Sequence, residues 1–188
     1  MRKAAIAGAA FALGGLCVAL AWFAAHRSER AAVTPPGRPV WSEVEWPFPT
    51  DQWGKGKAFQ CKPADCGTEV DLYLRAKIGF CNCATGVADD DELERVGDIA
   101  LIGGEASALA PGRAIAVAWM KGRSRPYAVA KSFPPAESAL ALALNEHCDA
   151  IVATLVMARG RASAMEGPAI DFLGSDVVLR WAERTLGL

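Results

Sequence analysis

The pattern of apolar and polar positions divides the chain into three parts. Residues 4–25 form an apolar run without a charged side chain, directly after Arg2 and Lys3. Residues 26–40 contain three prolines, which favours an extended linker because proline fixes φ and disfavours helix in the residue before it. Residues 41–188 mix short apolar and polar stretches, a pattern typical of one folded domain.

The apolar run at residues 4–25 predicts export. As a helix it is long enough to cross a hydrocarbon core of about 30 Å, which favours an uncleaved membrane anchor. The small residues Ala19 and Ala21 also fit a signal-peptide cleavage site, so a cleaved signal peptide is the alternative. We expect the N-terminus inside and the domain outside the cytoplasm, either anchored through residues 4–25 or secreted or periplasmic after cleavage. This orientation places a cysteine-rich domain in an oxidising compartment.

Strict alternation predicts a strand over residues 69–81. Apolar side chains occupy the even positions from 70 to 80, and most odd positions are polar or charged, so the strand is expected to have one dry and one solvated face. Shorter stretches with apolar runs or alternation predict further strands at residues 57–61, 114–121, 127–131 and 149–158.

Three segments predict helices. Residues 89–96 begin with an acidic first turn behind the capping residue Asp89, and residues 175–186 have one apolar and one charged face. Residues 136–147 follow two prolines and carry Leu140 and Leu144 four positions apart. The aromatic residues of segment 40–53 are expected to pack over the core. Together the elements predict an α+β fold: a single compact domain with a mostly antiparallel sheet and two or three helices, preceded by an N-terminal apolar helix.

Composition and motifs restrict the function. The formal net charge of −1 over 188 residues gives no electrostatic field that would gather nucleic acid. The chain contains no glycine-rich phosphate loop, no Gly-x-Ser-x-Gly, no His-Glu-x-x-His and no haem-attachment motif. These observations favour a non-enzymatic domain that acts by binding or assembly with a protein partner. An enzyme whose reactive groups meet only in the folded chain is an alternative.

The cysteines are the most informative residues for chemistry. Cys61, Cys66, Cys81 and Cys83 fall within 23 residues. In an oxidising compartment they favour structural disulfides, in any of three pairings. Four thiolates could instead bind zinc, or two or three of them cuprous copper, which makes metal handling a second hypothesis. Redox catalysis is the third interpretation. Cys148 is interpreted as a small buried apolar side chain.

A basic segment supplies one further candidate site. Lys121, Arg123 and Arg125 lie in or next to a turn predicted at residues 122–126, between two predicted strands. They could bind a phosphate or a lipid head group, or they could simply be solvated.

Overall fold

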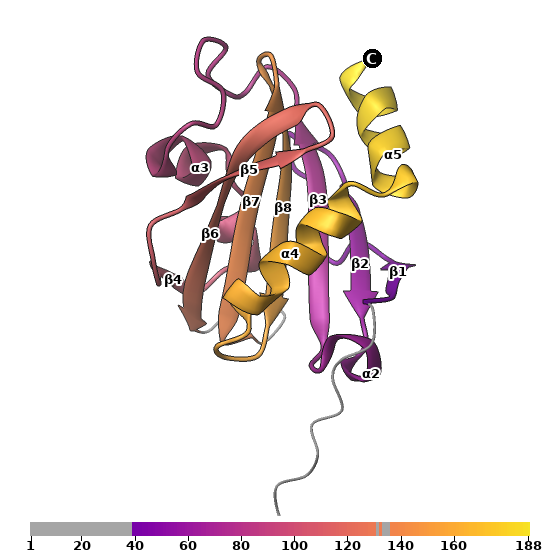
Figure 1. Cartoon of the computed structure of the whole chain (residues 1–188), viewed down its shortest axis with the longest axis vertical. Coiled ribbons are helices and arrows are strands. Elements are labelled where there is room, and N and C mark those ends of the chain that lie inside the picture. Colours follow the sequence, from indigo (N-terminus) through magenta and orange to yellow (C-terminus); the bar gives the residue numbers. More distant parts are fainter. Residues whose placement is uncertain (1–38, 131, 133–135) are drawn as a thin grey trace, which may run out of the picture. The chain divides into compact units, whose positions relative to one another are not determined.

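The computed structural model describes residues 39–130, 132 and 136–188, and its centre is one antiparallel sheet (Figure 1). The apolar segment 4–25 and nearly all of the linker lie outside the described residues. In the parts of the chain that are described, no helix is long and apolar enough to cross a membrane. The strands are β1 (Trp41–Val44), β2 (Lys57–Cys61), β3 (Val70–Lys77), β4 (Glu105–Ala108), β5 (Arg113–Val117), β6 (Met120–Ala130), β7 (Ser138–Glu146) and β8 (Asp149–Met157).

The strand order places β3, β8 and β7 in the middle of the sheet. The order is β1-β2-β3-β8-β7-β6-β4, and every pairing is antiparallel. Strand β6 pairs along one side with β7. Along its other side, the first half of β6 pairs with β5 and the second half with β4.

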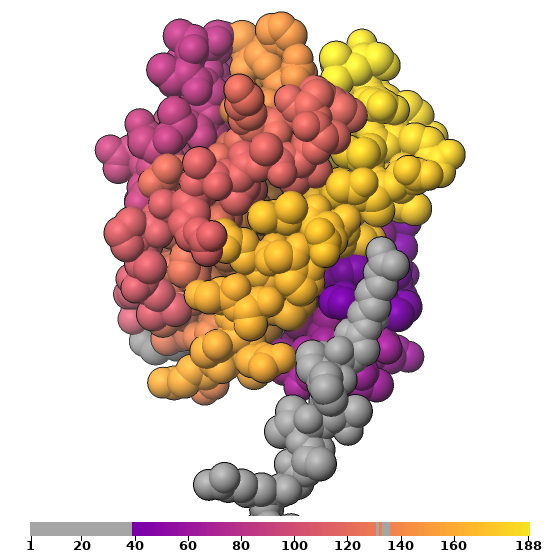
Figure 2. All heavy atoms as spheres, in the orientation of Figure 1, coloured from indigo at the N-terminus to yellow at the C-terminus, as the bar shows by residue number. Residues whose placement is uncertain are grey.

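Helices cover both faces of the sheet. Helices α4 (Ala162–Leu173) and α5 (Asp176–Leu186) lie on the face seen in Figure 2, where with the β5 hairpin they cover most of the strands. The opposite face packs against α3 (Asp90–Val96), the short helix η1 (Ile99–Ile102) and rings of the segment before β2. The central strands are therefore buried on both sides.

Several sequence predictions are confirmed. The strand predicted at residues 57–61 is β2, and the two longer strands predicted around residues 69–81 and 149–158 are β3 and β8. Helix α3 begins after Asp89, whose carboxylate accepts a hydrogen bond of 2.8 Å from the backbone N–H of Glu92. The predicted C-terminal helix is α5. The α+β fold is confirmed in its coarse form, as one antiparallel sheet with short helices.

The helix predicted at residues 136–147 is wrong, because most of this segment is strand β7. A spacing of four fits a helix, but it is also a multiple of the strand period of two. Leu140, Leu142 and Leu144 all face α4 and α5, and the alanines between them face the other side. Alanine is apolar and favours helix, so it concealed the alternation.

The turn predicted at residues 122–126 is also wrong. Strand β6 runs unbroken through this segment, and the turn lies earlier, where Ala118 adopts a φ of 51°. Gly122 marks a close approach of two strands: a Cβ atom there would lie 1.8 Å from the carbonyl oxygen of Ala143. Pro126 contributes its carbonyl, which accepts a hydrogen bond of 2.9 Å from the backbone N–H of Leu109.

Candidate functional site

Four of the cysteines form two disulfides, which confirms the prediction of a disulfide-stabilised domain. The expectation that Cys61, Cys66, Cys81 and Cys83 pair among themselves is wrong, because Cys83 is bonded to Cys148 and Cys81 is free. Cys61 at the end of β2 is bonded to Cys66, the last residue of the short helix α2 (Pro63–Cys66). We call this bond the short-loop disulfide, since its cysteines are five positions apart. Both residues are buried, and the carbonyl of Cys66 accepts a hydrogen bond of 3.2 Å from Arg161 Nη2.

The second disulfide joins Cys83 to Cys148 and is called here the long-loop disulfide, because 65 positions separate the two residues. It ties the connection between β3 and α3 to the turn between β7 and β8. The interpretation of Cys148 as an apolar packing residue is therefore wrong. Its partner lies far away in the sequence, and only the hairpin of β7 and β8 brings the two together.

Cys81 is the free cysteine of the described residues, and it is buried. Its backbone N–H donates a hydrogen bond of 2.9 Å to the carbonyl of Cys148. Its thiol donates to the carbonyl oxygens of His147 at 3.2 Å and Asp149 at 3.5 Å. Burial raises the pKa of Cys81, and the carboxylate charges of Glu92 and Asp149 raise it further. The thiol therefore stays protonated at neutral pH.

The structure does not bring the four predicted metal ligands together. Cys61 pairs with Val70 at the start of β3, whereas Cys81 follows the end of the same strand. Eight residues of extended chain separate the two places by about 25 Å. Within the described residues, no group of three or more His, Cys, Asp or Glu side chains is arranged to hold a metal ion.

A cluster of four charges, three of them buried, lies on the α3 face of the sheet, next to the end of β3. Arg75 donates to both carboxylate oxygens of Asp98, at 2.9 and 2.7 Å, and to Asp51 at 2.6 Å. Lys77 lies 2.8 Å from the same Asp98 carboxylate and donates to the carbonyl of Gly97 at 3.2 Å. Arg75, Lys77 and Asp98 are only 3%, 4% and 7% exposed.

Aromatic rings surround this charge cluster. The guanidinium of Arg75 lies 5.8 Å from the ring centre of Trp46, and the ammonium of Lys77 lies 5.7 and 5.6 Å from those of Trp53 and Phe80. Cations over ring faces gain electrostatic attraction, particularly away from water. The odd positions of β3 were expected to form a solvated face, which is wrong for Arg75 and Lys77. Both lie beneath the Gly97–Asp98 segment and the neighbouring aromatic rings.

The basic candidates on β6 are held by carboxylates of α3. Arg123 pairs with Asp90, and Arg125 pairs with Glu94 at 2.6 Å and with Asp90 at 3.7 Å. The backbone N–H of Gly112 and the Arg123 guanidinium hold the pKa of Asp90 below its usual value. Lys121 is exposed. Anion binding at these residues stays a prediction, although both arginines already have anionic partners within the protein.

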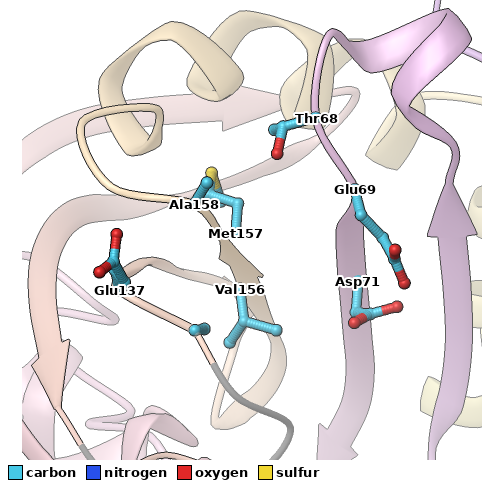
Figure 3. Close-up of a pocket in the computed structure, with 8 residues that line it drawn as sticks. Thr68, Glu69, Asp71, Glu137, Val156, Met157 and Ala158 are labelled. Atoms are coloured by element: carbon cyan, nitrogen blue, oxygen red, sulfur yellow. The ribbon is translucent and has the colours of Figure 1, made fainter.

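A pocket of about 510 Å³ opens between the start of β3 and the end of β8 (Figure 3). Glu69 and Asp71 project side by side from the start of β3, and Glu137 lies across the pocket (Figure 3). Residues between them supply an apolar floor that includes Val156 and Met157. Such a lining can accept hydrogen bonds and favours positive over negative charge.

Burial raises the pKa of Asp71 in this pocket. The hydrogen bond from Gln60 Nε2, at 3.2 Å, opposes the shift, and the charge of Glu69 adds to it. Gln60 also donates to Glu69 at 3.0 Å, so it bridges the two carboxylates and holds them in place.

Comparison of the chain with family models, curated proteins and solved structures found no match.

Proposed function

We propose that this protein is an exported domain that works in an oxidising compartment and acts by binding or assembly. The long-loop disulfide carries the proposal. Stable disulfides between distant residues form and persist outside the cytosol, where thiols are not kept reduced. The apolar run at residues 4–25 offers a segment that could deliver the domain there.

The alternative of zinc or copper handling receives no support from the geometry. Three of the four proposed ligand sulfurs, those of Cys61, Cys66 and Cys83, are engaged in disulfide bonds. The binding role rests on the sequence, which carries none of the catalytic motifs considered above.

A thiol-trapping experiment on the full chain in a bacterial host tests the proposal. Cells are treated with an alkylating reagent before lysis, and the protein is then mapped with and without reduction. Protease added to spheroplasts reports which side of the membrane the domain occupies. We expect the domain to be accessible to protease and to carry both disulfides. A protected domain with every cysteine alkylated before reduction would overturn the proposal.

A charge placed in the apolar run provides the matched control. Val18→Arg puts a charged side chain in the middle of the segment, where it costs about 3 kcal/mol in a membrane-inserted helix. The substitution changes no side chain of residues 41–188. We expect this variant to be exported less, and its retained fraction to contain reduced cysteines.

A further inference from the structure

The two disulfides differ in their access to solvent. Both cysteines of the short-loop disulfide are buried. In the long-loop disulfide, Cys83 is exposed and Cys148 is partly exposed. Exchange requires a thiolate to reach a disulfide sulfur, so exposed disulfides are the more labile ones. The long-loop disulfide is therefore the one open to exchange.

A third sulfur lies next to this disulfide. The backbone N–H of Cys81 donates a hydrogen bond of 2.9 Å to the carbonyl oxygen of Cys148, so the two residues are adjacent in space. Natural disulfides join residues whose Cα atoms lie about 4.4–6.8 Å apart, so they require neighbours of this kind. The Cys81 thiol contacts the carbonyls of His147 and Asp149, the two residues that flank Cys148. Cys81 and Cys83 thus approach the same cysteine from one short segment.

We propose that Cys81, Cys83 and Cys148 form a thiol–disulfide exchange site, in which Cys81 can replace Cys83 as the partner of Cys148. Cys81 first loses its proton. The thiolate attacks Sγ of Cys148, the new sulfur–sulfur bond forms, and the bond to Cys83 breaks. The electron pair leaves with Cys83, which takes up a proton. The number of disulfides is unchanged, so the step requires neither an oxidant nor a reductant.

The exchange moves the free thiol from a buried to an exposed position. After it, Cys83 carries the thiol in the turn that follows Cys81. This turn is held independently of the disulfide: the side chain of Asn82 accepts a hydrogen bond of 2.9 Å from the N–H of Ala84, and the N–H of Asn82 donates to Glu92 at 2.7 Å. The exposed thiol would then be available to a disulfide on a partner protein, forming a mixed disulfide and releasing a partner thiol.

Charged groups on two elements face the attacking thiol. Glu92 and Asp149 oppose formation of the Cys81 thiolate, and Arg95 of α3 favours it. Burial and the two carboxylates raise the pKa of the Cys81 thiol more than Arg95 lowers it. The exchange is therefore slow at neutral pH and accelerates as the pH rises. Below the pKa of the thiol, each pH unit raises the thiolate fraction, and with it the rate, by about tenfold.

The variant Cys83→Ser in the full chain tests whether Cys81 can reach Cys148. After purification in air, peptide mapping should find Cys81 bonded to Cys148. The proposal is overturned if Cys81 and Cys148 are both alkylated after unfolding. Cys61→Ser is the matched control. Among the described residues no third cysteine lies beside Cys66, so Cys66 should stay free while the long-loop disulfide remains.

A measurement on the unmodified protein keeps the proposal testable should Cys83→Ser fail to fold. The folded chain is incubated with iodoacetamide at pH 9 and mapped without reduction, with any label on Cys17 counted separately. We expect label on Cys83 together with a Cys81–Cys148 bond. Label confined to Cys81, or no label on either residue, overturns the proposal. Because purified oxidised protein is used, this outcome is independent of where the cell places the domain.

Discussion

Removal of the Asp98 charge is the most stringent test of the buried charge cluster. Asp98 is the shared anion of Arg75 and Lys77 and accepts three charged contacts of 2.7 to 2.9 Å. The variant Asp98→Asn preserves the size of the side chain but removes its negative charge. Asp51 then remains as a partner of Arg75, whereas the buried ammonium of Lys77 loses the carboxylate that it contacts.

The cost of this substitution follows from burial. Breaking a buried ion pair by removing one partner destabilises a protein by about 3–5 kcal/mol, because the remaining charge stays desolvated. The matched control is Asp51→Asn, which removes a carboxylate from the same guanidinium of Arg75. The Asp51 side chain is 41% exposed, so water can replace it, and the expected cost is about 0–1 kcal/mol.

Urea unfolding at pH 7 provides the assay. Trp46 is buried beside Arg75, so its fluorescence should report loss of the packing around the cluster. With a urea m-value of about 2 kcal/mol per molar, Asp98→Asn should lower the midpoint by roughly 2 M, and Asp51→Asn by less than about 0.5 M. Equal, small shifts for the two variants would refute the inference that burial makes Asp98 contribute more than Asp51 to the free energy of unfolding.

Three further outcomes are expected. A disulfide that closes a longer loop restricts the unfolded chain more. Removing the long-loop disulfide should therefore lower the free energy of unfolding by about 4 kcal/mol, and removing the short-loop disulfide by about 2 kcal/mol. Chemical denaturation of paired Cys→Ser variants measures both values. Gly122→Ala should lower the melting temperature sharply, because its Cβ would overlap the carbonyl of Ala143. Gly79→Ala has open space around its Cβ position and is strained only by its positive φ, so it should lower the melting temperature less. The pKa of Asp90 is lowered in the folded protein, so its carboxylate stabilises the fold at pH values above its unfolded pKa of about 4. This stabilisation should disappear as the pH falls through the lower pKa of the folded state. Asp90→Asn should flatten that part of the pH–stability curve.

The sheet was predictable where polar residues reveal the alternation. In β3 the charged residues at odd positions alternate with apolar ones, so the period of two is visible in the sequence. In β7 both faces are buried, and leucine alternates with alanine instead of with a polar residue. A strand that is buried on both sides loses its polar signal, and local propensity then favours the wrong element.

Helix α4 escaped prediction for a related reason. It contains Gly167 and Pro168 in its interior, two residues that normally argue against helix. Packing of buried side chains such as Met165, Ala169 and Leu173 against the sheet compensates for that local cost. Tertiary contacts thus override the local preference, and a single sequence does not show them.

The candidate site depends on contacts between distant segments, and this is why the sequence revealed its residue types but not their partners. The clustering of cysteines correctly indicated disulfides. Clustering favours neighbours as partners, however, and only one pair is local. Cys83 meets Cys148 because β8 pairs with β3 and thereby carries the β7–β8 turn to the end of β3.

The same strand pairing connects the charge cluster to the cysteines. Phe80 follows β3, and the charged groups of Lys77 and Arg95 lie 5.6 and 4.8 Å from its ring centre. Arg95 in turn donates to the carbonyl of Phe80 at 2.7 Å and lies among the charges around Cys81. These contacts fix the chain immediately before Cys81 whether Cys148 is bonded to Cys83 or to Cys81. The cluster therefore acts as a rigid support, so disulfide exchange should change which thiol is exposed without loosening the sheet.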